Sequence, residues 1–207
     1  MKIIAHGIKS LPEAKLAIRA GADFLEIDVS KRFFFDKFTA QHNGLMGIFG
    51  IGTLLDRILI AEIKTRAFLD LKPVSPRNSF ANKLAELLIK LKTKNTKICC
   101  HDWKMISKIC LQNSAHPFYT LKNKRSLEKF KRQLHFLKKP AGFSVNYKLI
   151  DKKFMKEFRR KSVQIWAWTV NDLKEAKRLA ELKVDGIITD EWGKIKLKKS
   201  AKFYFSP

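Results

Sequence analysis

The stretch DFLEIDVS, residues 23–30, sets two acids into an otherwise apolar run. Side chains on a β-strand alternate between its two faces, so Glu26 and Asp28 share one face while Leu25 and Ile27 share the other. Two like-charged carboxylates close together in a protein interior are costly unless a cation or a hydrogen-bond donor compensates them. The stretch therefore predicts a buried strand whose acids lie beside a positive group.

Short apolar runs of this kind recur along the chain and alternate with amphipathic segments. We expect eight strands, at residues 3–5, 24–29, 67–72, 97–102, 117–122, 142–146, 163–170 and 185–190. Apolar residues repeat with a helical period of 3.6 in five segments between them, at residues 11–21, 79–92, 103–112, 125–137 and 171–184. Eight strands joined by helical crossovers favour a closed parallel (β/α)8 barrel over an open doubly wound sheet, although 207 residues is near the short limit for that fold.

One segment interrupts this rhythm. Residues 31–66 contain an extra apolar run at 38–42 and a glycine-bearing run at 43–55, which together predict a hairpin and loop inserted after the second strand. We assign residues 1–193 to the barrel domain and residues 194–207 to a basic tail. Gly21 is the expected stop of the first helix and Asn171 the expected start of the last.

The charge balance is the most unusual feature of the composition. The chain has 43 basic and 19 acidic residues, a net charge of +24, which indicates an anionic partner such as a nucleic acid, a lipid headgroup or a phosphate ester. The lysines are spread along nearly the whole chain, and no helix-turn-helix, zinc-finger or RNA-recognition motif accompanies them. We therefore expect the basic surface to favour encounter with anionic lipid or substrate and expect no specific nucleic-acid partner.

Targeting segments and cysteine pairs are not expected from the sequence. No apolar run approaches the roughly 20 residues of a membrane-spanning helix, and the first ten residues lack the long apolar region of a secretory signal. Three cysteines form no CxxC pair, which argues against a disulfide framework. A cytoplasmic protein is expected, with Cys99 and Cys100 as core residues.

Polar residues gather at the ends of the first three ring strands, where the active site of such a barrel lies. His6 ends the first strand, Glu26 and Asp28 lie late in the second, and Asp70 and Lys72 end the third. Three carboxylates from two neighbouring strands form an oxygen-rich site suited to one hard divalent cation, Mg²⁺ or Ca²⁺. Lys72 beside them suggests a place for an anion such as a phosphate.

Two histidines flank the first two acids of the predicted cation site in the sequence. His6 precedes Glu26 and Asp28, and His42 follows them in the inserted hairpin. One can act as base or nucleophile while the other protonates a departing alkoxide, which is the chemistry of phosphodiester cleavage. His101, His116 and His135 are interpreted as surface or packing residues.

The order of motifs along the whole chain resembles the glycerophosphodiester phosphodiesterase family. The matching stretches are IAHG at 4–7, LPEA at 11–14, GADFLEIDV at 21–29, QHN at 41–43, LDLK at 69–72, WTVN at 168–171 and KVDGIITD at 183–190. Each is weak alone, and together they are specific. The resemblance implies hydrolysis of a glycerophosphodiester to glycerol phosphate and an alcohol, with a divalent cation as cofactor and a small phosphodiester as substrate.

Carried over residue by residue, the resemblance implies a catalytic pair at His6 and His42. It implies metal ligands at Glu26, Asp28 and Asp70, and substrate contacts at Lys72 and Trp168. The departures are that Gly7 follows His6 directly where the family has an arginine, that Asn43 replaces an aspartate, and that Asp70 replaces a glutamate.

Two other functions remain open on the sequence. The Asp70-Leu71-Lys72 pattern is similar to that of sphingomyelinase D-type phospholipases, which implies cleavage of lysophospholipid or sphingolipid headgroups as an alternative. A barrel with degenerate catalysis that binds nucleic acid or an anionic membrane would explain the charge of +24 and the missing arginine. It would not explain why all the other site residues remain.

Overall fold

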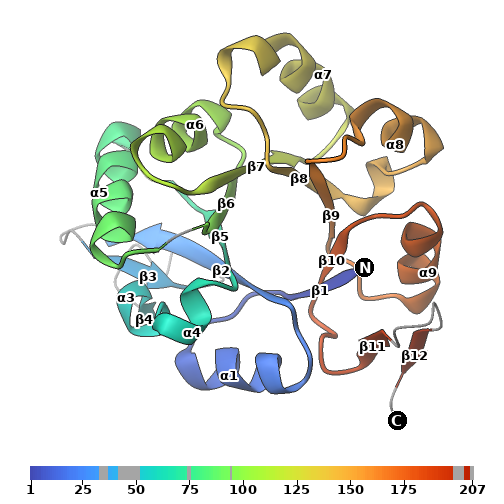
Figure 1. Cartoon of the computed structure of the whole chain (residues 1–207), viewed down its shortest axis with the longest axis horizontal. Helices are drawn as coiled ribbons and strands as arrows, with labels where there is room; N and C mark the ends of the chain where they lie inside the picture. The colour runs from blue at the N-terminus through green and yellow to red at the C-terminus, as the bar shows by residue number, and fades with distance from the viewer. Residues whose placement is uncertain (33–36, 42–51, 74–75, 94, 198–202, 206–207) are drawn as a thin grey trace.

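A closed ring of eight parallel strands forms the centre of the molecule, as the computed structural model in Figure 1 shows. The structure describes residues 1–32, 37–41, 52–73, 76–93, 95–197 and 203–205. Around the ring the order is β1, β2, β5, β6, β7, β8, β9, β10, and β10 pairs with β1 to close it. The expected (β/α)8 barrel is confirmed, and its ring strands are β1 (Lys2–Ala5), β2 (Phe24–Lys31), β5 (Ala67–Leu71), β6 (Lys97–Cys100), β7 (His116–Leu121), β8 (Gly142–Asn146), β9 (Gln164–Trp168) and β10 (Gly186–Thr189).

Helices cover the outside of the ring (Figure 1). The longer ones are α1 (Leu11–Arg19), α5 (Arg77–Lys90), α6 (Trp103–Gln112), α7 (Lys124–Gln133), α8 (Lys152–Phe158) and α9 (Leu173–Glu181). The short ones are α3 (Leu55–Ile58), α4 (Ala61–Lys64) and the 3-10 turns η1 (Leu134–Phe136) and η2 (Tyr147–Leu149). All five helices expected from periodicity are present, whereas α8 was not expected because its seven residues show barely two turns of the pattern.

The inserted hairpin lies directly after β2. Strand β3 (Phe38–Ala40) runs antiparallel to β2, and β4 (Thr53–Leu54) runs antiparallel to β3, so both lie outside the ring. This agrees with the predicted insertion. The part of that prediction at residues 42–51 falls outside the described residues.

The two faces of the ring strands bury different side chains. Leu25 and Ile27 of β2 pack outward with the helices in the larger apolar cluster. Phe24 packs inward with a second cluster that fills the barrel, whose fully buried members are Ile4, Phe68, Cys99, Phe118, Trp166 and Ile188. Because side chains alternate, Glu26 and Asp28 share the inward face with Phe24. The acids of the opening stretch are therefore inside the barrel.

Helix ends follow the expected chemistry with one exception. Helix α1 ends at Arg19, and Gly21 follows with a φ of +100°, a left-handed conformation that glycine adopts without steric cost. The cap of α9 is Asp172, whose side chain accepts a hydrogen bond from the backbone N–H of Glu175. The prediction of Asn171 as the helix start was wrong by one residue, because its side chain bonds to the end of β10 instead.

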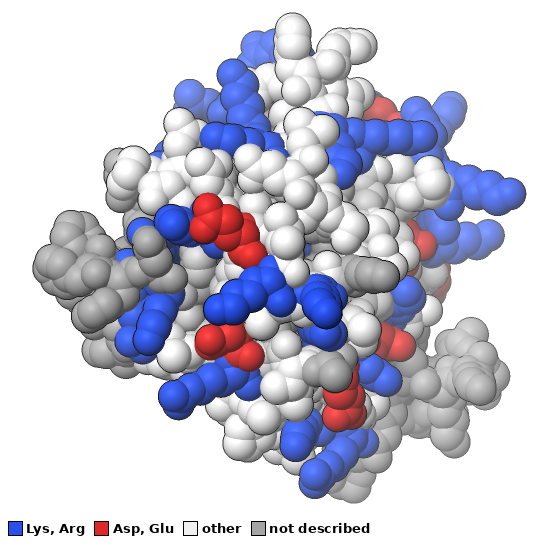
Figure 2. Space-filling view, turned by 60° about the vertical axis from the view of Figure 1, so that its left-hand side comes forward, with Lys and Arg blue, Asp and Glu red and all other residues white. Residues whose placement is uncertain are grey.

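Beyond the ring, β11 (Ile195–Leu197) and β12 (Phe203–Phe205) form a separate antiparallel pair. The division between barrel and tail at residue 193 stays a prediction. No helix in the described ranges is long and apolar enough to cross a membrane. On the face that Figure 2 shows, Lys and Arg side chains are scattered rather than gathered in one stripe, and they cover more surface than Asp and Glu do.

Candidate active site

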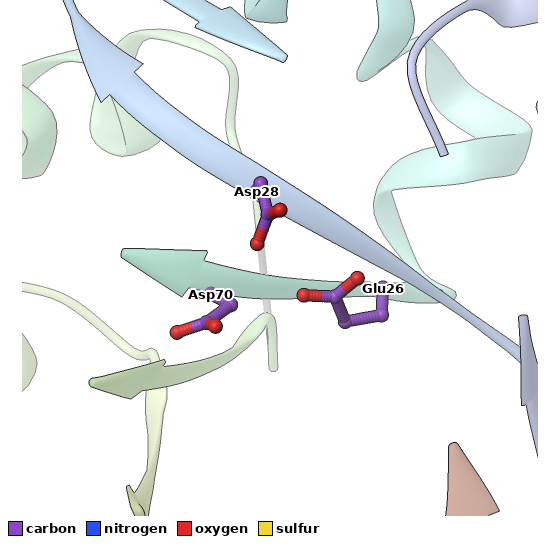
Figure 3. A group of neighbouring side chains, drawn as sticks. All are labelled: Glu26, Asp28 and Asp70. Atoms are coloured by element: carbon purple, nitrogen blue, oxygen red, sulfur yellow. The ribbon is translucent and has the colours of Figure 1, made fainter. Parts of the chain in front are cut away.

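Three carboxylates meet inside the barrel, beyond the level at which β1 ends (Figure 3). Parallel pairing of β2 with β5 sets Asp28 opposite Asp70, and Glu26 lies two residues earlier on the same face of β2. One oxygen from each of the three lies within 4.8 Å of the others. Glu26 and Asp28 are buried, and the side chain of Asp70 is 26% exposed. The structure thus brings together the three predicted metal ligands.

Lys72 provides the positive group that the opening stretch requires. Its ammonium lies 2.9 Å from Asp28 Oδ1 and also bonds to Asp70 Oδ2. Burial lowers the pKa of Lys72, but Asp70 and Asp28 outweigh that effect and hold its pKa above the ordinary lysine value. Lys72 is therefore a charged lysine, and it neutralises part of the acid cluster.

Glu26 carries the largest electrostatic cost in the cluster. Burial raises its pKa well above the usual range, and Asp28 and Asp70 raise it further because their charges repel its ionised form. The backbone N–H of Gly7 donates a 2.8 Å hydrogen bond to Glu26 Oε2 and opposes the shift. Gly7 has a φ of +68°, a left-handed conformation that turns this N–H toward the acid.

His6 joins the site from the end of β1. Its Nε2 lies 4.0 Å from Glu26 Oε2, and its Nδ1 lies 2.7 Å from Asp190 Oδ1. Because an ionised carboxylate only accepts hydrogen bonds, the Nδ1 proton of His6 is the donor to Asp190. That tautomer leaves Nε2 as the ring nitrogen on the side of Glu26.

Asp190 is itself held by a neighbour. The side-chain amide of Asn171 donates to Asp190 Oδ2 at 2.6 Å, while its oxygen accepts from the Thr189 hydroxyl at 3.0 Å and from the Asp190 backbone N–H at 2.9 Å. The result is a chain of hydrogen bonds from Asn171 through Asp190 to His6. The sequence reasoning missed Asp190, although its place directly after the last ring strand is the signal that selected His6.

The remaining predicted residues differ in what the structure says of them. His42 lies outside the described residues, so its proximity to His6 stays a prediction. Trp168 ends β9, is partly buried and packs against the cluster that fills the barrel. Trp166 is fully buried in that cluster, as expected of a core aromatic. Cys99 and Cys100 are buried core residues, also as expected.

The donor set suits a hard divalent cation. All three acidic side chains offer oxygen, their converging charge exceeds what the single ammonium of Lys72 neutralises, and a second cation would relieve the repulsion that raises the pKa of Glu26. The acid cluster can therefore hold a metal ion.

The acid cluster, Lys72 and His6 lie together in the (β/α)8 barrel, as expected for the class of phosphodiesterase barrels that the order of motifs resembles. The sequence profile of the glycerophosphoryl diester phosphodiesterase family matches residues 62–194, which is more than half of the chain. The chain belongs to this family, whose members are phosphoric diester hydrolases. No curated protein sequence matches it.

Solved structures show the same fold at low sequence identity. An Oleispira antarctica phosphodiesterase in complex with the product sn-glycerol-3-phosphate is 15% identical, with a TM-score of 0.71 over 94% of each chain. The Thermotoga maritima glycerophosphodiester phosphodiesterase is 20% identical, with a TM-score of 0.68 over 93% of this chain and 96% of that one. A Parabacteroides distasonis glycerophosphodiester phosphodiesterase is 18% identical, with a TM-score of 0.70 over 92% of each chain.

Proposed function

We propose that this protein hydrolyses glycerophosphodiesters to glycerol phosphate and an alcohol. The observation that carries the proposal is the meeting of the acid cluster, Lys72 and His6 at one end of the barrel. Family membership supports the reaction class. The sn-glycerol-3-phosphate bound to the Oleispira antarctica enzyme supports glycerol phosphate as the product.

Glu26, Asp28 and Asp70 would hold one divalent cation, Mg²⁺ or Ca²⁺. Such a cation supplies Lewis-acid stabilisation of the negative charge on phosphoryl oxygens. The chain itself contributes Lys72, whose side chain is 38% exposed and can contact a substrate phosphate while it remains close to Asp28. Lys72 is all the more important for binding the phosphate because no arginine follows His6.

Proton transfer is assigned to two histidines. With its Nδ1 proton directed to Asp190, His6 presents a basic Nε2 on the side of the acid cluster. His42 would have the opposite duty, so that one histidine starts the attack at phosphorus and the other protonates the departing oxygen. Trp168, at the end of β9, would line the pocket for the alcohol.

The test is a substrate panel assayed with purified protein. Glycerophosphocholine, glycerophosphoethanolamine and lysophosphatidylcholine are incubated with Mg²⁺, Ca²⁺ or a chelator, and the products are followed by ³¹P NMR. We expect glycerol phosphate from at least one of the first two, with release abolished by chelator. The double variant Glu26→Gln plus Asp28→Asn should lose this activity, while Glu86→Gln on the exposed face of α5 should retain it.

Two outcomes would contradict the proposal. Cleavage of lysophosphatidylcholine alone would favour the phospholipase D-like alternative. No turnover of any of the three with either cation would favour a barrel without catalysis. The cytoplasmic location remains a prediction from the sequence.

A further inference from the structure

Three large apolar side chains are exposed on adjoining elements far from the acid cluster. Phe136 and Leu134 belong to η1 and are 82% and 41% exposed, and Leu111 near the end of α6 is 76% exposed. Lys138 ties the two elements together, because its backbone N–H donates to Ser107 Oγ of α6 at 3.0 Å and its ammonium donates to the Cys110 carbonyl.

These residues lie at the amino-terminal ends of the ring strands. His116 begins β7, and the segments that enter β7, β8 and β9 bond to one another: the Ala141 N–H donates to the Pro117 carbonyl at 2.9 Å, and the Gln164 N–H donates to the Ala141 carbonyl at 3.0 Å. The acid cluster lies beyond the carboxyl end of β1, and Asp70 is next to last in β5. The two features therefore occupy opposite ends of the barrel.

A basic cleft lies at the same end of the barrel and includes Lys138, which bonds to α6 and follows η1 in the chain. It has a volume of about 310 Å³ and is lined by residues 114–117, residues 138–141 and Ser162. Its ionisable lining groups are His116, Lys138 and Lys139, and none of the described lining residues is acidic. Such a cleft is chemically suited to a phosphate group. We call Leu111, Leu134, Phe136, His116, Lys138 and Lys139 together the rim surface.

The charge around the rim surface is mainly positive. Residues 129–139, from the second half of α7 through η1 to the start of the cleft, contain five Lys or Arg and no acid. Lys131 is paired with Glu128 and Glu157, whereas Arg132 and Lys139 are exposed.

Exposed apolar side chains ringed by cations match an anionic bilayer better than a nucleic acid. A membrane interface takes up both aliphatic and aromatic side chains, and its negative headgroups attract Lys and Arg. A single-stranded nucleic acid would stack a base on Phe136, but Leu111 and Leu134 present no ring on which a base can stack. Leu111 and Leu134 therefore favour an anionic bilayer over a nucleic acid as the partner.

We propose that the rim surface docks this protein on an anionic phospholipid bilayer. Phe136, Leu134 and Leu111 enter the headgroup region, and the exposed Lys139 contacts a lipid phosphate at the basic cleft. Docking by this end leaves the opposite end of the barrel, with the acid cluster, facing water. The inference is independent of the proposed reaction, because it concerns binding at the other end of the barrel.

Vesicle binding without substrate tests the proposal. The protein is sedimented with vesicles of phosphatidylcholine alone or of equimolar phosphatidylcholine and phosphatidylglycerol, at low and at physiological salt. We expect binding to the anionic vesicles that weakens with salt. Phe136→Ser should weaken it at least about tenfold, as expected for loss of one buried aromatic side chain. Leu16→Ser, which alters an exposed apolar side chain on α1, should not.

Charge is tested with a second matched pair. Lys139→Glu should weaken binding to anionic vesicles more than Lys174→Glu, since Lys174 lies on α9 away from the rim surface. Equal losses from these two variants would show that only net charge matters and would overturn the proposal. Wild-type binding by Phe136→Ser would overturn it as well, as would equal binding to neutral vesicles.

Site-specific labelling reports which end of the barrel meets the lipid. The three native cysteines are buried, so Phe136→Cys introduces an exposed thiol for an environment-sensitive fluorophore. We expect a blue shift of its emission on anionic vesicles and none for Leu16→Cys labelled in the same way. A shift for Leu16→Cys alone would place the lipid contact elsewhere. Displacement of the vesicles by duplex DNA at physiological salt would make nucleic acid the partner and would overturn the lipid assignment.

Discussion

Replacement of Glu26 by glutamine should stabilise the metal-free protein while it removes a ligand for the cation. The substitution Glu26→Gln keeps the shape of the side chain and leaves an oxygen to accept the 2.8 Å hydrogen bond from the Gly7 N–H. It removes the charge that Asp28 and Asp70 repel. A ligand of a functional metal site is thus expected to be a destabilising residue when the metal is removed.

The size of the effect follows from the distances in the cluster. At 4.8 Å, the bound on the ligand-atom separations, two unit charges repel by about 3.5 kcal/mol at an effective dielectric constant of about 20. Asp28 and Asp70 both repel Glu26, and the attraction of Lys72 offsets part of this repulsion. A net gain of about 1–3 kcal/mol corresponds to a rise in Tm of roughly 3–10 °C for a chain of this length.

The stability gained by Glu26→Gln should depend on pH in a defined direction. The folded-state pKa of Glu26 lies above its unfolded value. The contribution of Glu26 to stability is therefore largest below the unfolded glutamate pKa of about 4.3 and is lost as pH rises through the folded pKa. Glutamine does not titrate. The advantage of Glu26→Gln should therefore be small near pH 4, grow as pH rises, and level off above the folded pKa of Glu26.

Thermal unfolding followed by circular dichroism between pH 4 and pH 8, in chelator, measures this difference. Glu86→Gln, which removes an exposed carboxylate 3.4 Å from Lys83, serves as the control and should change Tm little. Addition of Mg²⁺ or Ca²⁺ should raise the Tm of the wild type and not that of Glu26→Gln. A lower Tm for Glu26→Gln at pH 8 in chelator, or an advantage that does not grow with pH, would refute the reasoning.

Other parts of the structure support three further predictions. Asp190→Asn should lower kcat/KM at least about tenfold with little change in KM. An uncharged amide stabilises the Nδ1 proton of His6 less than a carboxylate does, and its NH2 group can face Nδ1 and favour the other tautomer. Unchanged kinetics would remove Asp190 from the site. Gly142→Ala should lower Tm, since its added Cβ would meet the Phe118 ring at 2.3 Å and the Gln164 carbonyl at 2.7 Å. Overpacking of this kind costs roughly 1–3 kcal/mol. A wild-type Tm measured by calorimetry would contradict this. The native thiols should resist iodoacetamide at pH 8 until the protein unfolds, as burial raises the pKa of Cys100 and Cys110 to about 12; fast alkylation seen by mass spectrometry would count against it.

Patterns among near neighbours in the sequence were enough to predict the barrel and the four charged residues that its second and third ring strands contribute to the site. Alternation of side chains along a strand is a short-range property, so the stretch at residues 23–30 was enough to set Glu26 and Asp28 on one face and to require a cation beside them. The same reasoning applied to residues 69–72 supplied Asp70 and Lys72. Pairing of consecutive ring strands then brought the two stretches together without any further information.

Short helices and caps were less accessible from the sequence. Helix α8 is only seven residues long, and periodicity over two turns does not separate a helix from a loop. At α9, Asn171 and Asp172 are both good capping residues, so the sequence could not choose between them. Asp172 is the cap because the side chain of Asn171 is bonded to the end of β10 instead, to the Thr189 hydroxyl and the Asp190 carboxylate.

Ring closure decided what no local pattern could. His6 and Asp190 are 184 residues apart in the sequence, and they meet because β10 pairs with β1. The position of Phe136 at the amino-terminal end of the barrel, opposite the acid cluster, likewise depends on how α7 returns to β8. The sequence by itself determined which residues carry charge and which face of a strand they share, since both depend on near neighbours in the chain. Which distant residues become neighbours was decided only when eight strands closed into a ring.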